Sequence, residues 1–309
     1  IMRNAMMESR MHLAEKDCDL ILLTRDLGLR VFEEFEKRHP KQFLNVGVSE
    51  QNMIGIASGL ALKGKKVFVY SIGNFPTLRC LEQIRNDACY HQLNINIVAM
   101  GAGFSYGALG MSHHATEDIA IMSSLPEVTV LSPSTKDEAK QLVNNAYFEK
   151  GVCYIRIDKS SITSDVPNPD IKIGNAYTLA EGGSGIIIFA TGGIAEEAIK
   201  ARSALLEEGV YVEVASISTV KPIDREFILS KSKQNNYVIT LEEHNTFNGL
   251  GSLIANLLYE EGVFNKKFTK LGVDDEYVSI VGSQKFLREY CGIDAISIKS
   301  IIKKYISEF

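Results

Sequence analysis

Hydrophobic and polar positions along the chain form two recurring patterns, short apolar runs and longer amphipathic stretches. Several of the apolar runs are continuous, which is typical of strands covered on both faces and therefore of parallel sheets. The runs predict strands at residues 20–23, 66–70, 96–100, 129–131, 153–157, 185–189, 211–214 and 237–240. The amphipathic stretches predict helices at residues 2–15, 49–62, 78–89, 136–148, 195–208 and 249–260.

This alternation predicts an α/β protein with two domains, each a mostly parallel sheet with helices on both faces. A chain of 309 residues is long enough for two separate hydrophobic cores. Residues 158–175 crowd Ser, Asp, Asn and Pro together without hydrophobic periodicity, which indicates a connector. We therefore place the two domains at residues 1–165 and 176–309.

Composition narrows the classes of function. The 33 Lys and Arg residues are spread along the chain and are outnumbered by 38 Asp and Glu, which disfavours a nucleic-acid partner. The five cysteines form no C-x-x-C pair, as expected for a reducing compartment. Residues 1–10 lack a signal-peptide pattern, and the longest uncharged run, residues 88–116, is too polar for a bilayer. These features predict a soluble, cytoplasmic protein.

The stretch FLNVGVSEQNMIGIASGLAL, residues 43–62, joins a strand-like run to a helix rich in small residues. Small side chains let a helix approach neighbouring backbone closely, so we expect this helix to be buried. Glu50 then lies in its first turn, at the carboxyl end of a strand, where open α/β sheets bind ligands. A carboxylate at this position can also simply complement the helix dipole, and the local pattern leaves both interpretations open.

A second candidate region is GAGFSYGALGMSHHATED, residues 101–118, which follows a predicted strand. Its four glycines and the adjacent His113 and His114 can bring backbone and imidazole close to a ligand. The initial Gly-x-Gly could begin a dinucleotide-binding loop, but the third glycine and immediate helix of that fingerprint are missing. His113, His114 and Glu117 could bind zinc, although adjacent histidines point apart and no other cluster completes a site. We predict no metal site in this chain.

Taken together, several segments resemble the transketolase family of thiamine diphosphate enzymes. The resemblance is carried by VGVSEQNMIGIASGLAL (46–62), YSIGNFPTLRCLEQIRND (70–87), GMSHHATEDIAIMSSLPEVTVLSP (110–133), STVKPIDREFI (218–228) and EEHNTFNGLGS (242–252). These segments stand in the family's order, and the resemblance runs nearly end to end. It implies a pyrimidine-binding domain in residues 1–165 and the family's C-terminal domain in residues 176–309.

The resemblance covers only the second part of a typical transketolase. The family's other domain binds the cofactor diphosphate through Mg²⁺, using a Gly-Asp-Gly segment followed by Asn, and no Asp-Gly pair occurs in this chain. The resemblance therefore implies one subunit of a split transketolase, inactive by itself, with a partner chain that supplies the diphosphate and Mg²⁺ half. Because the cofactor would lie between domains of different chains, it also implies a two-plus-two heterotetramer.

The resemblance gives Glu50 the role of the family's catalytic glutamate. That glutamate hydrogen-bonds the aminopyrimidine of thiamine diphosphate and favours the imino tautomer, which deprotonates the thiazolium carbon. Because this chemistry needs a carboxyl that can share or donate a proton, partial burial that raises the pKa of Glu50 would help. The cofactor then carries a two-carbon ketol group from a ketose phosphate to an aldose. Tyr70 and Phe75 match the region that packs aromatic rings against the pyrimidine, although an aromatic residue at a strand end is commonly core.

Further residues match substrate-binding positions of the family. His113 matches a histidine that contacts sugar oxygens near the reacting carbonyl, and His114 is a second candidate for substrate binding. Arg3, Arg79 and Lys159 fall where the family, or the related deoxyxylulose phosphate synthases, hold substrate phosphates, as basic side chains suit. Each of these three could equally be a solvated surface charge.

Leu109 departs from the family pattern. Relatives often carry Asp at this position, four residues before the substrate-facing histidine, where it recognises a substrate hydroxyl. Loss of that hydrogen-bonding partner predicts a substrate other than, or broader than, the usual pentose phosphate pair.

Three other functions stay open. A 2-oxoacid dehydrogenase beta subunit has the same two domains and the same kind of glutamate, although LRCLEQIRND and SHHATEDIAIM favour transketolase. The chain could also be a non-catalytic interaction subunit or, more remotely, a nicotinamide enzyme. The C-terminal domain is assigned no catalytic residue, and its Gly-Leu-Gly at residues 249–251 is expected to be a packing feature at a helix start.

Overall fold

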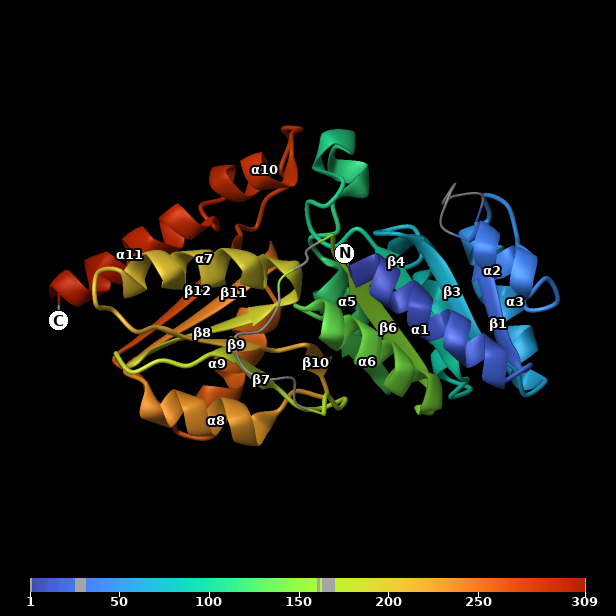
Figure 1. The fold of residues 1–309 in the computed structure, drawn as a ribbon, viewed down its shortest axis with the longest axis horizontal. Coiled ribbons are helices and arrows are strands. Elements are labelled where there is room, and N and C mark those ends of the chain that lie inside the picture. Colours follow the sequence, from blue (N-terminus) through green and yellow to red (C-terminus); the bar gives the residue numbers. More distant parts are fainter. Residues whose placement is uncertain (1, 26–31, 160–161, 163–169, 309) are drawn as a thin grey trace.

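The computed structural model describes residues 2–25, 32–159, 162 and 170–308. Two sheets lie side by side in an elongated molecule, the first half of the chain around one and the second half around the other (Figure 1). Helices cover both faces of each sheet, and most neighbouring strands are parallel. The predicted α/β class with two mostly parallel sheets is thereby confirmed.

The first sheet has seven strands in the order β10-β5-β6-β4-β3-β1-β2, and only the pair of β10 with β5 is antiparallel. The central strands β4 and β6 are buried along their whole length because helices cover both their faces, which explains their continuous apolar sequence. The strands are β1 (Leu20–Thr24), β2 (Phe43–Asn45), β3 (Lys66–Ile72), β4 (Ile95–Met100), β5 (Val128–Leu131), β6 (Val152–Ile157) and β10 (Thr219–Lys221).

Two helical layers sandwich this sheet. Helices α1 (Met2–Lys16) and α6 (Lys136–Phe148) pack on one face, and α3 (Glu50–Leu62) and α5 (Asp118–Ser124) pack on the other. Helix α6 begins where predicted because the Thr135 hydroxyl caps it, accepting a hydrogen bond from the Glu138 N–H at 3.1 Å. The predicted helix 78–89 is instead divided into η1 (Leu78–Cys80), α4 (Leu81–Gln83) and the π-helical η2 (Ile84–Cys89). The remaining short elements are α2 (Glu33–Arg38), η3 (Gly107–Leu109) and η4 (Met111–His113).

The second sheet has five strands in the order β12-β11-β8-β9-β7, with β7 antiparallel to β9. Helices α7 and α11 cover one face, α8 and α9 cover the other, and α10 lies beside the loop that follows β4 (Figure 1). The elements are β7 (Tyr177–Ala180), β8 (Ile186–Thr191), η5 (Gly192–Ile194), α7 (Ala195–Leu206), β9 (Glu213–Ser216), α8 (Arg225–Gln234), β11 (Tyr237–Asn245), α9 (Leu250–Glu260), β12 (Lys267–Val273), α10 (Gln284–Tyr290) and α11 (Ala295–Glu308).

The start of α9 is fixed by a buried carboxylate. Glu242 accepts hydrogen bonds from the backbone N–H groups of Leu250 (2.7 Å) and Gly251 (2.8 Å). A Cβ on Gly249 would lie 2.7 Å from the Glu242 carboxyl carbon, so the close approach requires glycine. The Gly-Leu-Gly segment is thus a packing feature at the helix start.

Four strands are missing from the list of predicted strands, β2, β7, β10 and β12, and all lie at sheet edges; only β2 was indicated otherwise, by the strand-like run before Glu50. Edge strands are short or partly solvated, so they lack the continuous apolar run that marks central strands. Strand β10 comes from the second half of the chain and completes the first sheet, which ties the two halves together. No helix in the described part of the chain is long and apolar enough to span a membrane.

Candidate active site

The carboxyl ends of five neighbouring parallel strands meet at one edge of the first sheet, in the order β6-β4-β3-β1-β2. Arg25 follows β1, Glu50 opens the helix after β2, and Phe75 lies in the turn after β3. His113 lies in the loop after β4, and Lys159 follows β6. Parallel topology therefore gathers segments far apart in the sequence at the edge where open α/β sheets bind ligands.

Glu50 is buried at the N-terminus of α3, with 1% of its surface exposed. One carboxylate oxygen accepts a hydrogen bond from Arg25 Nη1, and the other accepts one from Arg79 Nη1 at 2.8 Å. The side chains of Arg25 and Arg79 are 12% and 47% exposed. The carboxylate is therefore held between two guanidinium groups, one nearly buried and one open to solvent.

The pKa of Glu50 is shifted in the direction opposite to the one that burial alone would give. Burial opposes the ionised form, but the Glu50 backbone N–H and the charges of Arg79 and Arg25 outweigh it, so the pKa lies below its ordinary value. Part of the reason is tertiary, because the fold brings two arginines to Glu50 and their contributions add to that of the backbone N–H in outweighing burial.

We expect Arg25→Gln to raise the pKa of Glu50, because it removes one of the two cations while burial stays. Since the folded pKa is depressed, ionised Glu50 stabilises the fold above the unfolded pKa of about 4.3 and loses that contribution as the pH falls through the folded pKa. The variant should therefore lose less stability on acidification. A ¹³C NMR titration of the Glu50 carboxyl measures the shift. The matched control is Arg38→Gln, because Arg38 forms an exposed pair with Glu34. If this control shifted the pKa of Glu50 as much as Arg25→Gln does, Arg25 would not be the cause of the shift.

Phe75 lies at the centre of this group. The guanidinium carbons of Arg25 and Arg79 are 4.8 Å and 4.7 Å from its ring centroid, and the His113 ring meets it edge-on at 5.2 Å between centroids. Cations over an aromatic face are attracted to its π electrons. Phe75 thus connects the two arginines that bind Glu50 with His113.

The two histidines point into different surroundings. His113 is half-buried, its Nδ1 lies 3.0 Å from Ser112 Oγ, and burial followed by the charges of Arg25 and His114 lowers its pKa, so it is neutral near pH 7. His114 is buried, with Nε2 3.2 Å from the Gly107 carbonyl oxygen and its ring edge-on to Phe104. The structure therefore brings His113, and not His114, to Phe75.

Tyr70 does not join the Glu50 group. It is 4% exposed and packs on the α1 face of the sheet, edge-on to Phe32 at 4.7 Å between ring centroids. Burial raises its pKa to about 12. These contacts are those of a core aromatic residue, so Tyr70 belongs to the hydrophobic core and not to the Glu50 group.

The basic residues predicted to bind phosphate fall into two groups. Arg79 belongs to the Glu50 group, whereas Arg3 and Lys159 lie near Tyr106. Lys159 Nζ donates to the Ser105 carbonyl oxygen at 2.6 Å and lies 4.2 Å from the Tyr106 ring centroid. Burial lowers the pKa of Lys159; Asp158 opposes this, and Arg3 adds to it.

Leu109, at the position where relatives often carry Asp, is 57% exposed on the η3 turn. It borders a cavity of about 330 Å³ whose other lining residues come from the same loop, from Lys159 and from residues 282–284. An apolar side chain here offers no hydrogen bond to a ligand in that cavity.

Arg25 was not among the site residues predicted from the sequence. One signal could have identified it, because it directly follows a predicted strand and so lies at the carboxyl edge of the sheet. Its proximity to Glu50 depends on β1 pairing with both β2 and β3, which no local pattern encodes. Among the described residues, no three His, Cys, Asp or Glu side chains converge as a metal-binding cluster.

Comparison with known proteins identifies the family to which this chain belongs. Residues 1–164 match the family model of the transketolase pyrimidine binding domain, and residues 174–298 match that of the transketolase C-terminal domain. The chain belongs to the transketolase family.

Three relatives match nearly the whole chain. It is 37% identical to a "Putative transketolase C-terminal section" of Methanocaldococcus jannaschii, over 99% of this chain and 96% of the relative. It is 32% identical to one of the subunits of an apulose-4-phosphate transketolase of Actinobacillus succinogenes, over 96% and 95% of the two chains. A solved structure described as "Split gene transketolase, inactive beta4 tetramer" superposes with a TM-score of 0.85 and 31% identity, covering 98% of this chain and 97% of that one.

Proposed function

We propose that this chain is one subunit of a split transketolase, which transfers a two-carbon ketol group from a ketose phosphate to an aldose acceptor. Residues 1–165 form its pyrimidine-binding domain and residues 176–309 its C-terminal domain. A partner chain supplies the diphosphate and Mg²⁺ half of the thiamine diphosphate site, in a two-plus-two assembly in the cytoplasm. The single observation that carries the proposal is the buried Glu50 carboxyl at the carboxyl edge of a parallel sheet, joined to Phe75 through Arg25 and Arg79.

The residues at this edge fit the pyrimidine ring of thiamine diphosphate. The Glu50 carboxyl can share a hydrogen bond with a ring nitrogen, and Phe75 would offer a flat apolar face once a guanidinium group that lies over it is displaced. Each carboxylate oxygen accepts one hydrogen bond from an arginine, and release of one of these contacts would give a ring nitrogen access to the carboxyl. Arg79 is the more exposed of the two arginines, which favours it as the contact that is released.

When bound, thiamine diphosphate supplies the carbanion and the electron sink for ketol transfer. Glu50 holds or shares the proton at the pyrimidine nitrogen, and release of an arginine moves its pKa upward toward that task. His113 is neutral and can donate or accept a hydrogen bond at a sugar oxygen. Positive charge for the substrate phosphate comes from Arg79, Arg3 and Lys159. We keep His114 as a proposed second contact to the sugar, although its buried ring packs against Phe104.

Reconstitution tests the proposal. We expect the chain alone to be inactive, and a mixture with a chain that carries the diphosphate-binding domain to convert sugar phosphates in the presence of thiamine diphosphate and Mg²⁺. Activity on simple or branched-chain 2-oxoacids instead would support the dehydrogenase alternative. The named relatives favour transketolase, because they include transketolase subunits.

Leu109→Asp should move substrate preference toward the usual pentose phosphate pair. The substitution adds a carboxylate that can hydrogen-bond a sugar hydroxyl at the cavity rim, and such a partner discriminates strongly between substrates with and without the hydroxyl. We expect the ratio of kcat/KM values to shift by about tenfold or more. Leu206→Asp, at the end of α7, is the control. Ordinary pentose phosphate selectivity of the unmodified complex would contradict the interpretation of Leu109.

A further inference from the structure

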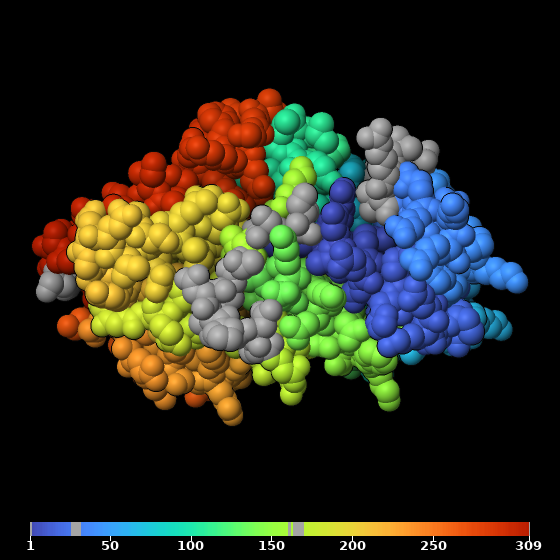
Figure 2. All heavy atoms as spheres, in the orientation of Figure 1, coloured from blue at the N-terminus to red at the C-terminus, as the bar shows by residue number. Residues whose placement is uncertain are grey.

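The loop between β4 and α5, which carries His113, packs against the second half of the chain. The Phe104 N–H donates to Glu243 Oε1 at 2.5 Å, and the Phe104 ring is fully buried against Val273, Val278 and Leu287. Figure 2 shows the red segment around α10 directly against the green loop, at the upper edge of the molecule. The loop is therefore held against the second half of the chain.

Two glycines of this loop permit that approach. A Cβ on Gly103, which has a φ of +54°, would lie 2.5 Å from Glu243 Cγ. A Cβ on Gly107 would lie 2.5 Å from Leu287 Cδ1 and 2.7 Å from the Gly282 carbonyl oxygen. Contacts this short exclude any side chain, so the loop sequence is adapted to this surface.

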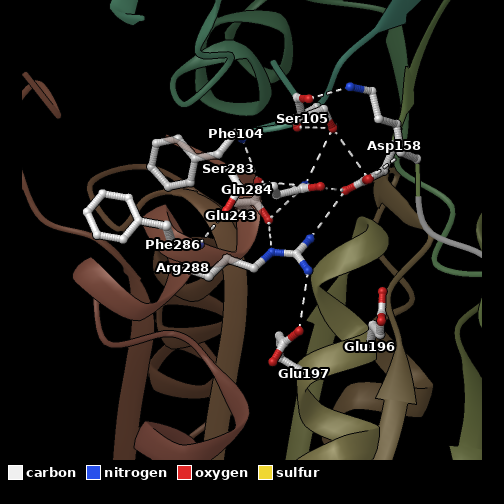
Figure 3. Close-up of polar contacts among 12 residues, drawn as sticks. Phe104, Ser105, Asp158, Glu196, Glu197, Glu243, Ser283, Gln284, Phe286 and Arg288 are labelled. Carbon is white, nitrogen blue, oxygen red and sulfur yellow. Dashed lines mark hydrogen bonds and ion pairs between the residues drawn. The ribbon is translucent and has the colours of Figure 1, made fainter. Parts of the chain in front are cut away.

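Glu243 is the centre of a buried polar network (Figure 3). It is 1% exposed, and its Oε2 accepts a hydrogen bond from Arg288 Nε at 2.5 Å, while Oε1 also accepts one from Gln284 Nε2 at 2.9 Å. Arg288 is 5% exposed, and its Nη1 lies 3.5 Å from Glu197 on α7. The network thus fixes α10 to β11 and α7.

The same network reaches the segment after β6. Arg288 Nη2 lies 3.6 Å from Asp158 Oδ2, and Gln284 Nε2 lies 3.3 Å from the same oxygen. Asp158 also accepts hydrogen bonds from the Lys159 N–H and, at 3.4 Å, from Ser105 Oγ. One buried cluster therefore contacts both the His113 loop and the backbone of Lys159.

We propose that Arg288 and Glu243 are positioning residues, which hold the His113 loop and Lys159 in the geometry that binds a phosphorylated sugar. The inference rests on the proposed function and gives the C-terminal domain a part in substrate binding. Compared with apolar packing, a buried ion pair adds little net stability to a fold. We therefore attribute the Arg288–Glu243 pair to the geometry that it fixes. Neither side chain touches Glu50 or Phe75 in the structure, so cofactor binding should be spared.

The test uses the assembled complex with its partner chain. Arg288→Met and Glu243→Gln are compared with Arg288→Lys, which keeps a cation for Glu243, and with Arg225→Met, which removes an exposed pair on α8. Hydrogen exchange of residues 101–116, steady-state kinetics and thiamine diphosphate affinity are measured for each. Glu243→Gln is nearly isosteric, so the test survives if Arg288→Met fails to fold.

We expect exchange in residues 101–116 to rise, KM for the phosphorylated sugar to rise by about tenfold to a hundredfold, and kcat to fall less than KM rises. Cofactor affinity should stay within about twofold, Arg288→Lys should recover part of the change in KM, and Arg225→Met should resemble the unmodified complex. Unchanged KM in both Arg288→Met and Glu243→Gln would overturn the proposal, whether or not exchange rises. Turnover that survives Glu50→Gln would overturn the proposed function instead, which separates the two failures.

Discussion

Glu50→Gln in the assembled complex should lower kcat by about a hundredfold to ten-thousandfold, the range attributed to a positioned proton-transfer group. The amide keeps the shape of the carboxyl but cannot hold or share its proton. The two arginines that contact Glu50 would also lose their counter-charge. Steady-state assays with a ketose phosphate donor and an aldose acceptor measure the effect.

Glu36→Gln is the matched control, because Glu36 is exposed on α2, away from the buried carboxylate of the candidate site. It should leave kcat and KM unchanged. If Glu50→Gln retained full turnover with thiamine diphosphate bound, the chain would be better described as a non-catalytic interaction subunit.

Arg156→Met should destabilise the folded chain by about 3–5 kcal/mol, as expected when one partner of a buried ion pair is removed. Arg156 is 2% exposed, and its Nε donates to Asp118 Oδ2 at 2.8 Å. Its Nη2 also donates to the carbonyl oxygens of Ala115 (2.9 Å) and Glu243 (2.8 Å). The substitution leaves a buried carboxylate and two carbonyls without this donor, at a place where both halves of the chain meet.

Urea unfolding of the isolated chain gives the free energy, provided that the transition is two-state. Arg225→Met serves as the control, since Arg225 pairs with Glu261 at the surface and such pairs contribute about 1 kcal/mol or less. If both variants lost the same free energy of unfolding, the buried Arg156–Asp118 pair would contribute no more to stability than an exposed pair.

The predicted strands were most accurate at the sheet centres and least accurate at the sheet edges, and helices α5, α8, α10 and α11 were not predicted. Burial on both faces leaves a continuous apolar run, so strands such as β4 and β6 are visible from the sequence. Edge strands such as β10 lack that pattern and require knowledge of a distant pairing partner. For the same reason, the sequence could not show that β10 completes the sheet of the other half.

The site residues divide in a similar way. Resemblance to the transketolase family named Glu50, Phe75 and His113; in the structure the Phe75 ring contacts His113 and the two arginines that bind Glu50. It also named Tyr70 and His114, whose side chains the packing turns into the interior. A motif specifies which residues stand near a site, but the direction of each side chain depends on the surrounding packing.

By itself, the sequence determined the alternation of buried strands and helices, and with it the carboxyl edge at which Glu50 lies, because hydrophobic periodicity records which faces are covered. Only the tertiary structure brought Arg25 and Arg79, which lie 25 and 29 residues away along the chain, to the Glu50 carboxyl, where both lower its pKa. It also decided that Glu243 holds a loop 139 residues away. Coulombic and hydrogen-bond energies act over a few ångströms in space, so they follow strand order and domain packing, which local sequence does not record.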